Sequence, residues 1–137
     1  MLLLIKKLMN DFSIILVPIS IGELFDKITI LQIKKNRIKG NKLDNVNKEL
    51  NHLEEVVKNN NLKIEKKFFT QIKKINTNLW EIEDEIRIKE SKNEFDQEFI
   101  DLARSVYKEN DKRASLKKEI NLNYGSLFVE EKSYKSY

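Results

Sequence analysis

The stretch between Val106 and Leu116 carries the side chains best suited to recognition or chemistry. The apolar spacing on either side of it is helical, so about two turns of one helix face present polar groups where apolar ones are expected. Such groups weaken a core unless they satisfy one another, fix the register of the helices or bind a ligand. A register-setting polar layer and a ligand site are equally good interpretations. The residues concerned are Tyr107, Asn110, Asp111 and Arg113.

A second candidate lies on an earlier helix that is predicted to be apolar on two sides. Leu24, Ile28 and Leu31 form one stripe, and a second stripe runs from Asp26 through two isoleucines to Arg37. Such a helix is either central in its bundle or shared with a partner chain. We favour an interface with Asp26 and Arg37 at its edges over a polar pocket between helices, because dimer seams are common and pockets need convergent groups.

A third candidate is a polar line along the third predicted helix. Asn76, Trp80, Glu83 (or Asp84) and Arg87 follow the apolar stripe at helical spacing. A tryptophan is costly to expose and usually marks an interface or the wall of a pocket. We favour a Trp80 packed on the bundle over a Trp80 that stacks on a ligand, because core and interface aromatics are the more common.

The composition excludes several kinds of chemistry. There is no cysteine and one histidine, so we expect no metal site, and we expect no cofactor because the sequence lacks a glycine-rich phosphate loop. The formal net charge is +4, but 22 of the 26 basic residues are lysine and they are spread evenly over the chain. Proteins that bind nucleic acid usually concentrate basic residues on one face or arm. We therefore do not expect a nucleic-acid partner.

The hydrophobic spacing predicts four helices that position these candidates. The first begins at a capping box formed by Ser20 and Glu23 and ends near Lys39, with Gly40 in the left-handed conformation. The others cover about residues 42–58, 62–90 and 94–124. Short loops force successive helices antiparallel, and the two long helices exceed what a small globule needs. The prediction is an all-α fold, an elongated antiparallel helical bundle of about four helices with short extended N- and C-terminal segments.

The 137 residues have room for one domain. We interpret residues 1–137 as a single helical domain, in which residues 1–13 form an N-terminal extension, with Met9 as an alternative start, and residues 126–137 form an extended tail. Residues 13–17 are expected to be extended and partly buried. Neither N-terminal apolar run approaches the ~18 residues that cross a bilayer, and a signal peptide fits poorly. We predict a cytoplasmic protein without membrane insertion.

Distinctive motifs are spread over about residues 14–134. They are VPISIGEL at 17–24 with DKITIL at 26–31, NLW at 78–80 with IED at 82–84, LARSVY at 102–107, ND at 110–111 with RA at 113–114, and EEKSY at 130–134. Their combination resembles an uncharacterised bacterial and phage family known only as a domain of unknown function. The resemblance implies no activity, but it implies a link to glycan biosynthesis and one shared functional surface. That surface would hold Glu23, Asp26, Lys27, Trp80, Glu83, Tyr107, Asn110, Asp111 and Arg113, to which the spacing adds Arg37 and Arg87.

The first predicted helix is also similar to that of the all-helical chorismate mutases, which share its rhythm of isoleucines, acidic and basic residues. Those enzymes are helical dimers that hold a dianionic substrate with arginine and lysine and work by orientation and electrostatics. The similarity implies that Lys27, Lys34, Arg37 and Arg113 would supply cations here. It covers one helix, the arginine expected before that helix is absent, and the helix lengths differ.

These observations leave two classes of function. The first is a non-catalytic helical homodimer that acts as an interaction or assembly module, with another protein as its partner. The alternative is a small-anion-binding helical protein, or a chorismate-mutase-like enzyme, that takes an anionic metabolite and is linked to glycan biosynthesis. The first class is narrowly ahead, because no acid–base pair with a clear role is evident. The sequence leaves open whether the protein is an enzyme.

Overall fold

The computed structural model describes Met1 and residues 13–137. Most of the predicted N-terminal extension, including Met9, lies outside these described residues. Within them the chain forms helices α2 (Ile21–Arg37), α3 (Asn41–Asn59), α4 (Lys66–Ser91) and α5 (Gln97–Asn123), and no strand. The prediction of an all-α fold with about four helices is therefore confirmed.

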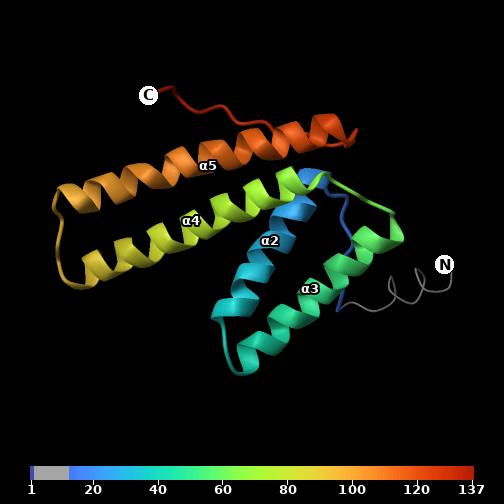
Figure 1. The fold of residues 1–137 in the computed structure, drawn as a ribbon, viewed down its shortest axis with the longest axis horizontal. Helices are drawn as coiled ribbons and strands as arrows, with labels where there is room; N and C mark the ends of the chain where they lie inside the picture. The colour runs from blue at the N-terminus through green and yellow to red at the C-terminus, as the bar shows by residue number, and fades with distance from the viewer. Residues whose placement is uncertain (2–12) are drawn as a thin grey trace.

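Helices α4 and α5 form a long antiparallel pair, and α2 crosses one end of that pair (Figure 1). α3 turns back from α2 and lies against it. Of the described helices, α2 is the one whose backbone closely approaches all three others, whereas α3 closely approaches only α2. The two apolar stripes on α2 are explained by this central position, which was one of the two alternatives for a helix of that pattern.

One of the two hydrogen bonds of the predicted capping box forms at the start of α2. The Ser20 side chain accepts a hydrogen bond from the Glu23 backbone N–H at 3.1 Å. The Glu23 carboxylate, however, binds Lys117 on α5 instead of reaching back to the cap. Gly40 has a φ of 72° but a ψ of −150°, so it lies outside the left-handed helical region and serves as the N-cap residue of α3.

Two helices begin later than their apolar spacing predicts. After Asn61, which has a φ of 50°, the chain stays non-helical up to the N-cap of α4, and this loop carries Leu62 and Ile64 onto the core. α5 begins after Asp96, whose side chain accepts from the Phe99 backbone N–H at 3.0 Å. An acidic residue at an N-cap accepts hydrogen bonds from free backbone N–H groups and interacts favourably with the positive end of the helix dipole. This explains why α5 starts after Asp96.

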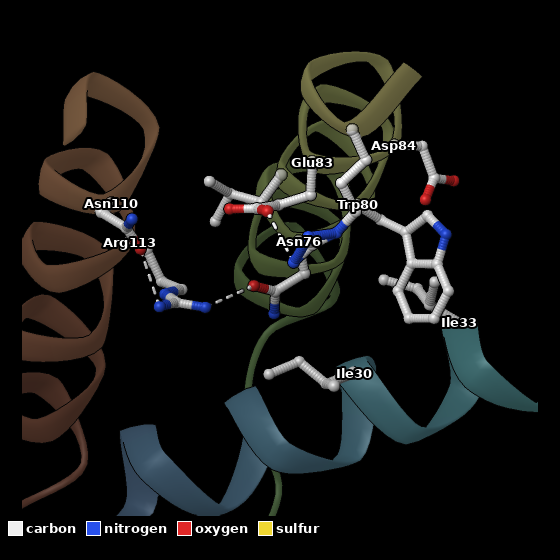
Figure 2. A pocket seen from close by; sticks show the side chains of 10 residues that line it. Ile30, Ile33, Asn76, Trp80, Glu83, Asp84, Asn110 and Arg113 are labelled. Atoms are coloured by element: carbon white, nitrogen blue, oxygen red, sulfur yellow. Dashed lines mark hydrogen bonds and ion pairs between the residues drawn. The ribbon is translucent and has the colours of Figure 1, made fainter. Parts of the chain in front are cut away.

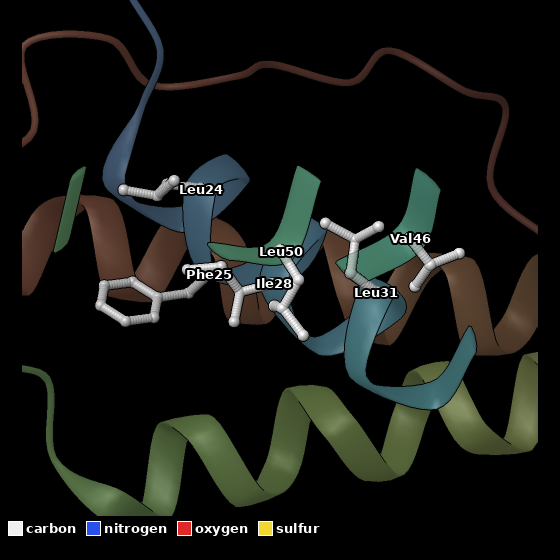
Figure 3. Packing of buried hydrophobic residues seen from close by; sticks show 6 residues of the cluster. All are labelled: Leu24, Phe25, Ile28, Leu31, Val46 and Leu50. Atoms are coloured by element: carbon white, nitrogen blue, oxygen red, sulfur yellow. The ribbon is translucent and has the colours of Figure 1, made fainter. Parts of the chain in front are cut away.

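The apolar core has two parts. One lies between α2 and α3, and each of its large side chains contributes roughly 1.5–3 kcal/mol by burial; it consists of Leu24, Phe25, Ile28, Leu31, Val46 and Leu50 (Figure 3). The other lies between α4 and α5 and consists of Phe68, Ile72, Leu116 and Ile120. Ile21 and Ile64 pack against both parts, so the two helical pairs share one continuous apolar contact.

Gly22 lies directly against the backbone of α5. A Cβ atom at this position would lie 2.6 Å from the backbone oxygen of Lys117. The Gly22 N–H donates to Oδ1 of Asn121 at 2.7 Å, although the two residues are 99 positions apart. A residue without a side chain therefore sets how α2 sits on α5.

The terminal segments are extended. Ile15, Leu16 and Val17 are exposed, so the prediction that residues 13–17 are partly buried is wrong for these three. The C-terminal tail runs back along α5 (Figure 1), held by an ion pair from Lys118 to Glu131. These three side chains belong to neither part of the apolar core, so they stay open to solvent.

Candidate functional site

A buried hydrogen-bond network joins α2 to α4. Asp26, Thr29 and Asn76 are 4%, 0% and 4% exposed. Nδ2 of Asn76 donates to Oδ1 of Asp26 at 2.8 Å and to the Thr29 hydroxyl at 2.9 Å, and that hydroxyl donates to the Asp26 backbone oxygen at 2.8 Å. Because both amide protons of Asn76 are committed to α2, its carbonyl oxygen has to face the other way, toward α5.

Arg113 on α5 donates a hydrogen bond to that carbonyl oxygen. One of its terminal nitrogens donates to Oδ1 of Asn76 at 3.2 Å and the other to Oδ1 of Asn110 at 2.7 Å. Both acceptors are neutral. Among the described residues Arg37 and Arg87 have carboxylate partners, whereas Arg113 has none. A half-buried guanidinium is thus held in place by amides while its positive charge is left uncompensated.

Lys117, one turn further along α5, has the opposite surroundings. Its ammonium group lies 2.5 Å from Glu23, 3.2 Å from Glu130 and 3.5 Å from Asp26. Burial alone would lower the pKa of Lys117, but the hydrogen bond to Glu23 and the charge of Asp26 outweigh it, so the pKa is raised above its usual value. This lysine stays protonated and serves as the cation of a closed ion-pair cluster.

A pocket of about 400 Å³ opens where α2 leaves the α4–α5 pair (Figure 2). We call it the Arg113 pocket. Ile30 and Ile33 come from α2 and form an apolar side, and Trp80 forms a second wall from α4. The full lining is Ile30, Ile33, Asn76, Leu79, Trp80, Glu83, Asp84, Arg87, Asn110 and Arg113.

The charges of the Arg113 pocket are partly neutralised within it. Arg87 pairs with Glu83 at 3.2 Å on the same helix. Asp84 has no hydrogen-bond or ion-pair partner in the described part of the chain, and it lies on the opposite side of the pocket from Arg113 (Figure 2). Among residues 13–137, the pocket therefore presents one cation on α5 and one carboxylate on α4 that have no partner of opposite charge.

Trp80 is held from outside the pocket. The guanidinium of Arg37 lies 5.7 Å from the centre of the indole ring, and it pairs with Glu81 at 3.3 Å. Arg37 is not part of the lining, so it supports the outer side of the wall.

Two other hollows are less suited to an anion. A pocket of about 260 Å³ between α5 and the tail shares Asn110 and Arg113 with the Arg113 pocket, but its Lys117 and Lys132 both pair with Glu130. A wider hollow of about 790 Å³ on α4 and α5 is lined by three lysines and three acidic residues. Apart from Arg113, neither hollow has a cation that is held in place and lacks a carboxylate partner among the described residues.

The structure divides the predicted functional surface into separate places. Trp80, Glu83, Arg87, Asn110 and Arg113 line the Arg113 pocket. Glu23 and Asp26 belong to the cluster beneath it, around Lys117.

The remaining predicted residues lie elsewhere. Lys27 faces Glu49 on α3 at 3.8 Å. Tyr107 and Asp111 contact the last residue of the tail, since the ring of Tyr137 lies 4.9 Å from that of Tyr107 and its hydroxyl donates to Asp111 at 2.8 Å. Of the four cations suggested by the chorismate mutase similarity, only Arg113 lines the pocket.

Thr29 and Glu130 lie within the DKITIL and EEKSY motifs, but they were not among the predicted site residues. Thr29 could have been found, because it lies three residues after Asp26 and therefore on the same helix face. Glu130 had no such signal: its contact with Lys117 depends on how the tail runs over α5, which no local pattern encodes.

Within residues 13–137 no group of three or more histidine, cysteine, aspartate or glutamate side chains is placed to hold a metal ion. No helix in the same part of the chain is long and apolar enough to cross a membrane.

Fold and site together define a small all-α protein with a polar pocket formed by three helices. The chain belongs to a family of unknown function (DUF6165), and the model of that family matches residues 15–137. No curated protein and no solved structure matched it.

Proposed function

We propose that this protein binds a small anionic ligand in the Arg113 pocket. The observation that carries the proposal is the guanidinium of Arg113, which two neutral amides orient and which has no carboxylate partner among the described residues. An unpaired, half-buried cation in a concave site favours a ligand that brings the missing negative charge.

The surroundings of Arg113 support a binding role over a purely structural one. The carboxylate nearest in the network, Asp26, is occupied by Asn76 and Lys117, so it is not available to neutralise Arg113. Asn110 uses its oxygen on Arg113 and keeps its NH2 group for another acceptor. An acidic group bound here would accept hydrogen bonds from both side chains.

The test is a titration of the full chain with benzoate, acetate and inorganic phosphate. Trp80 is the single tryptophan of the sequence, so its indole N–H resonance reports directly on the pocket. We expect saturable shifts of that resonance with at least one anion, and their loss in Arg113→Gln, which keeps a hydrogen-bond donor and removes the charge.

Arg104→Gln is the matched control, because Arg104 lies on the same helix, is exposed and does not line the pocket. Binding that survives Arg113→Gln, or the absence of any saturable shift in the wild-type protein, would contradict the proposal. Circular dichroism of each variant verifies that the helices are retained.

We also propose that the protein assembles as a homodimer through the end of the α4–α5 pair. Ile88, Phe95 and Ile100 are 53%, 55% and 47% exposed near the turn between the two helices. Exposed apolar side chains of this size, carried by neighbouring parts of the chain, are typical of an interface. A second copy of the chain is the partner proposed here.

Light scattering measures the mass that decides this second proposal. We expect a dimer for the wild-type chain and a monomer after Phe95→Gln with Ile100→Gln. Leu122→Gln is the control, because Leu122 is 65% exposed at the other end of α5. A wild-type monomer would refute the dimer.

We also propose that the protein is cytoplasmic, as the sequence predicts, and cell fractionation tests this location.

A further inference from the structure

We infer that the ligand of the Arg113 pocket is a monoanionic ring acid that carries hydroxyl groups at the end away from its acidic group. The inference rests on the proposed function and goes beyond it by naming the ligand class. It follows from the distribution of charge, apolar surface and hydrogen-bond acceptors around the pocket.

The charges of the pocket limit the number of acidic groups on the ligand. Since Glu83 is neutralised by Arg87, the free charges that line the pocket in the described part of the chain are Arg113 and Asp84. They lie on opposite sides (Figure 2). A ligand with one acidic group places it on Arg113, whereas a second acidic group would approach Asp84 and be repelled. Repulsion between two unit charges near a protein surface weakens binding by about tenfold.

The apolar part of the lining determines the body of the ligand. It consists of Ile30, Ile33, Leu79 and the indole of Trp80. A cavity of about 150 Å³ holds benzene, so about 400 Å³ has room for one ring together with its polar substituents. A ring covers an indole face with more contact area than a flexible chain and loses less conformational entropy on binding.

Asp84 determines the far end of the ligand. An ionised aspartate only accepts hydrogen bonds, so Asp84 selects a donor. It has no partner in the described part of the chain, which leaves its oxygens available. A hydroxyl group is a neutral donor that satisfies Asp84 without adding charge, and a hydrogen bond to a charged group raises affinity by about tenfold.

The experiment compares three acids that differ only at one ring position: benzoate, 4-hydroxybenzoate and terephthalate. Each is titrated into the full chain, with the Trp80 indole resonance as the readout. We expect 4-hydroxybenzoate to bind about tenfold more tightly than benzoate, and terephthalate to bind about tenfold more weakly.

Asp84→Asn assigns the discrimination to one side chain. In this variant we expect the affinity for terephthalate to approach the affinity for benzoate. Glu85→Gln is the matched control: it removes one negative charge from the neighbouring position of α4, which is exposed and outside the pocket lining. It should leave all three affinities as in the wild-type protein.

The outcomes separate the inference from the proposed function. If phosphate or acetate binds in an Arg113-dependent manner but no ring acid does, the inference about the ring is wrong and the proposed function stands. If benzoate binds and terephthalate binds equally or more tightly, the inference about charge is wrong. If no anion binds, the proposed function itself fails.

Discussion

Gly22→Ala tests the close contact between α2 and α5. The new methyl group would lie 2.6 Å from the backbone oxygen and 3.2 Å from the carbonyl carbon of Lys117, and 3.0 Å from Oδ1 of Asn121. Two of these three atoms belong to backbone of α5, which cannot rotate away as the end of a side chain can. α2 and α5 therefore have to separate.

The size of the effect follows from three contributions. Forcing an extra methyl group into a packed contact costs about 1–3 kcal/mol, and weakening the hydrogen bond from Gly22 to Asn121 costs about 1 kcal/mol. The better helix propensity of alanine returns at most about 1 kcal/mol. We expect a net loss of about 2 kcal/mol in the free energy of unfolding, which lowers Tm by roughly 6 °C for a chain of this size.

Thermal and urea denaturation followed by circular dichroism measure this loss. Asn121→Ala is the companion variant, because it removes the hydrogen bond without introducing a clash, and we expect it to cost about 1 kcal/mol. A Gly22→Ala variant as stable as the wild-type protein would show that α2 and α5 do not approach this closely, and the placement of α2 described above would have to be abandoned.

Three further predictions concern charged groups. Asp26→Asn should lower the free energy of unfolding by about 2 kcal/mol in urea denaturation, because a buried, hydrogen-bonded carboxylate becomes neutral; an unchanged value would contradict the buried network. Lys89→Met should lower Tm, since Lys89 binds three carboxylates around the α4–α5 turn, and the exposed control Lys92→Met should not. The pKa of the Glu130 carboxyl should lie below its usual value, mainly because of the hydrogen bond from Lys132 and to a smaller extent because of the one from Lys117. A group with a lowered folded-state pKa contributes stability above its unfolded pKa and loses it as pH falls through the folded value. Carbon-13 titration should show a low pKa for Glu130, and Lys132→Met should raise it. A pKa at or above the usual value would refute this.

The sequence allowed much of the helical structure to be predicted, because the spacing of apolar residues directly reflects which side of each helix is buried. It also placed Trp80, Glu83 and Arg87 on one line of α4, and that line does border the pocket. Residues on one helix keep their relative positions whatever the helix packs against, which is why such a line could be found without a structure.

The placement of residues from different helices could not be predicted in the same way. Arg37 and Asp26 share a stripe on α2, yet one supports the outside of Trp80 and the other binds Asn76. Which neighbour each meets depends on the crossing of α2 over α4, and a different crossing angle would give them other partners. Tyr107 is a similar case, because its contact with the tail depends on a segment that lacks regular structure.

The central position of α2 has a consequence for the order of folding. The α2–α3 and α4–α5 pairs are each formed by neighbours in the chain and close rapidly, whereas the contact of Gly22 with Asn121 spans 99 positions. The Arg113 pocket takes its walls from both pairs, so neither pair has a binding site before the two have docked. We therefore expect the pocket to be the last feature to form during folding and the first to be lost when the pairs separate, and its occupation to slow that separation.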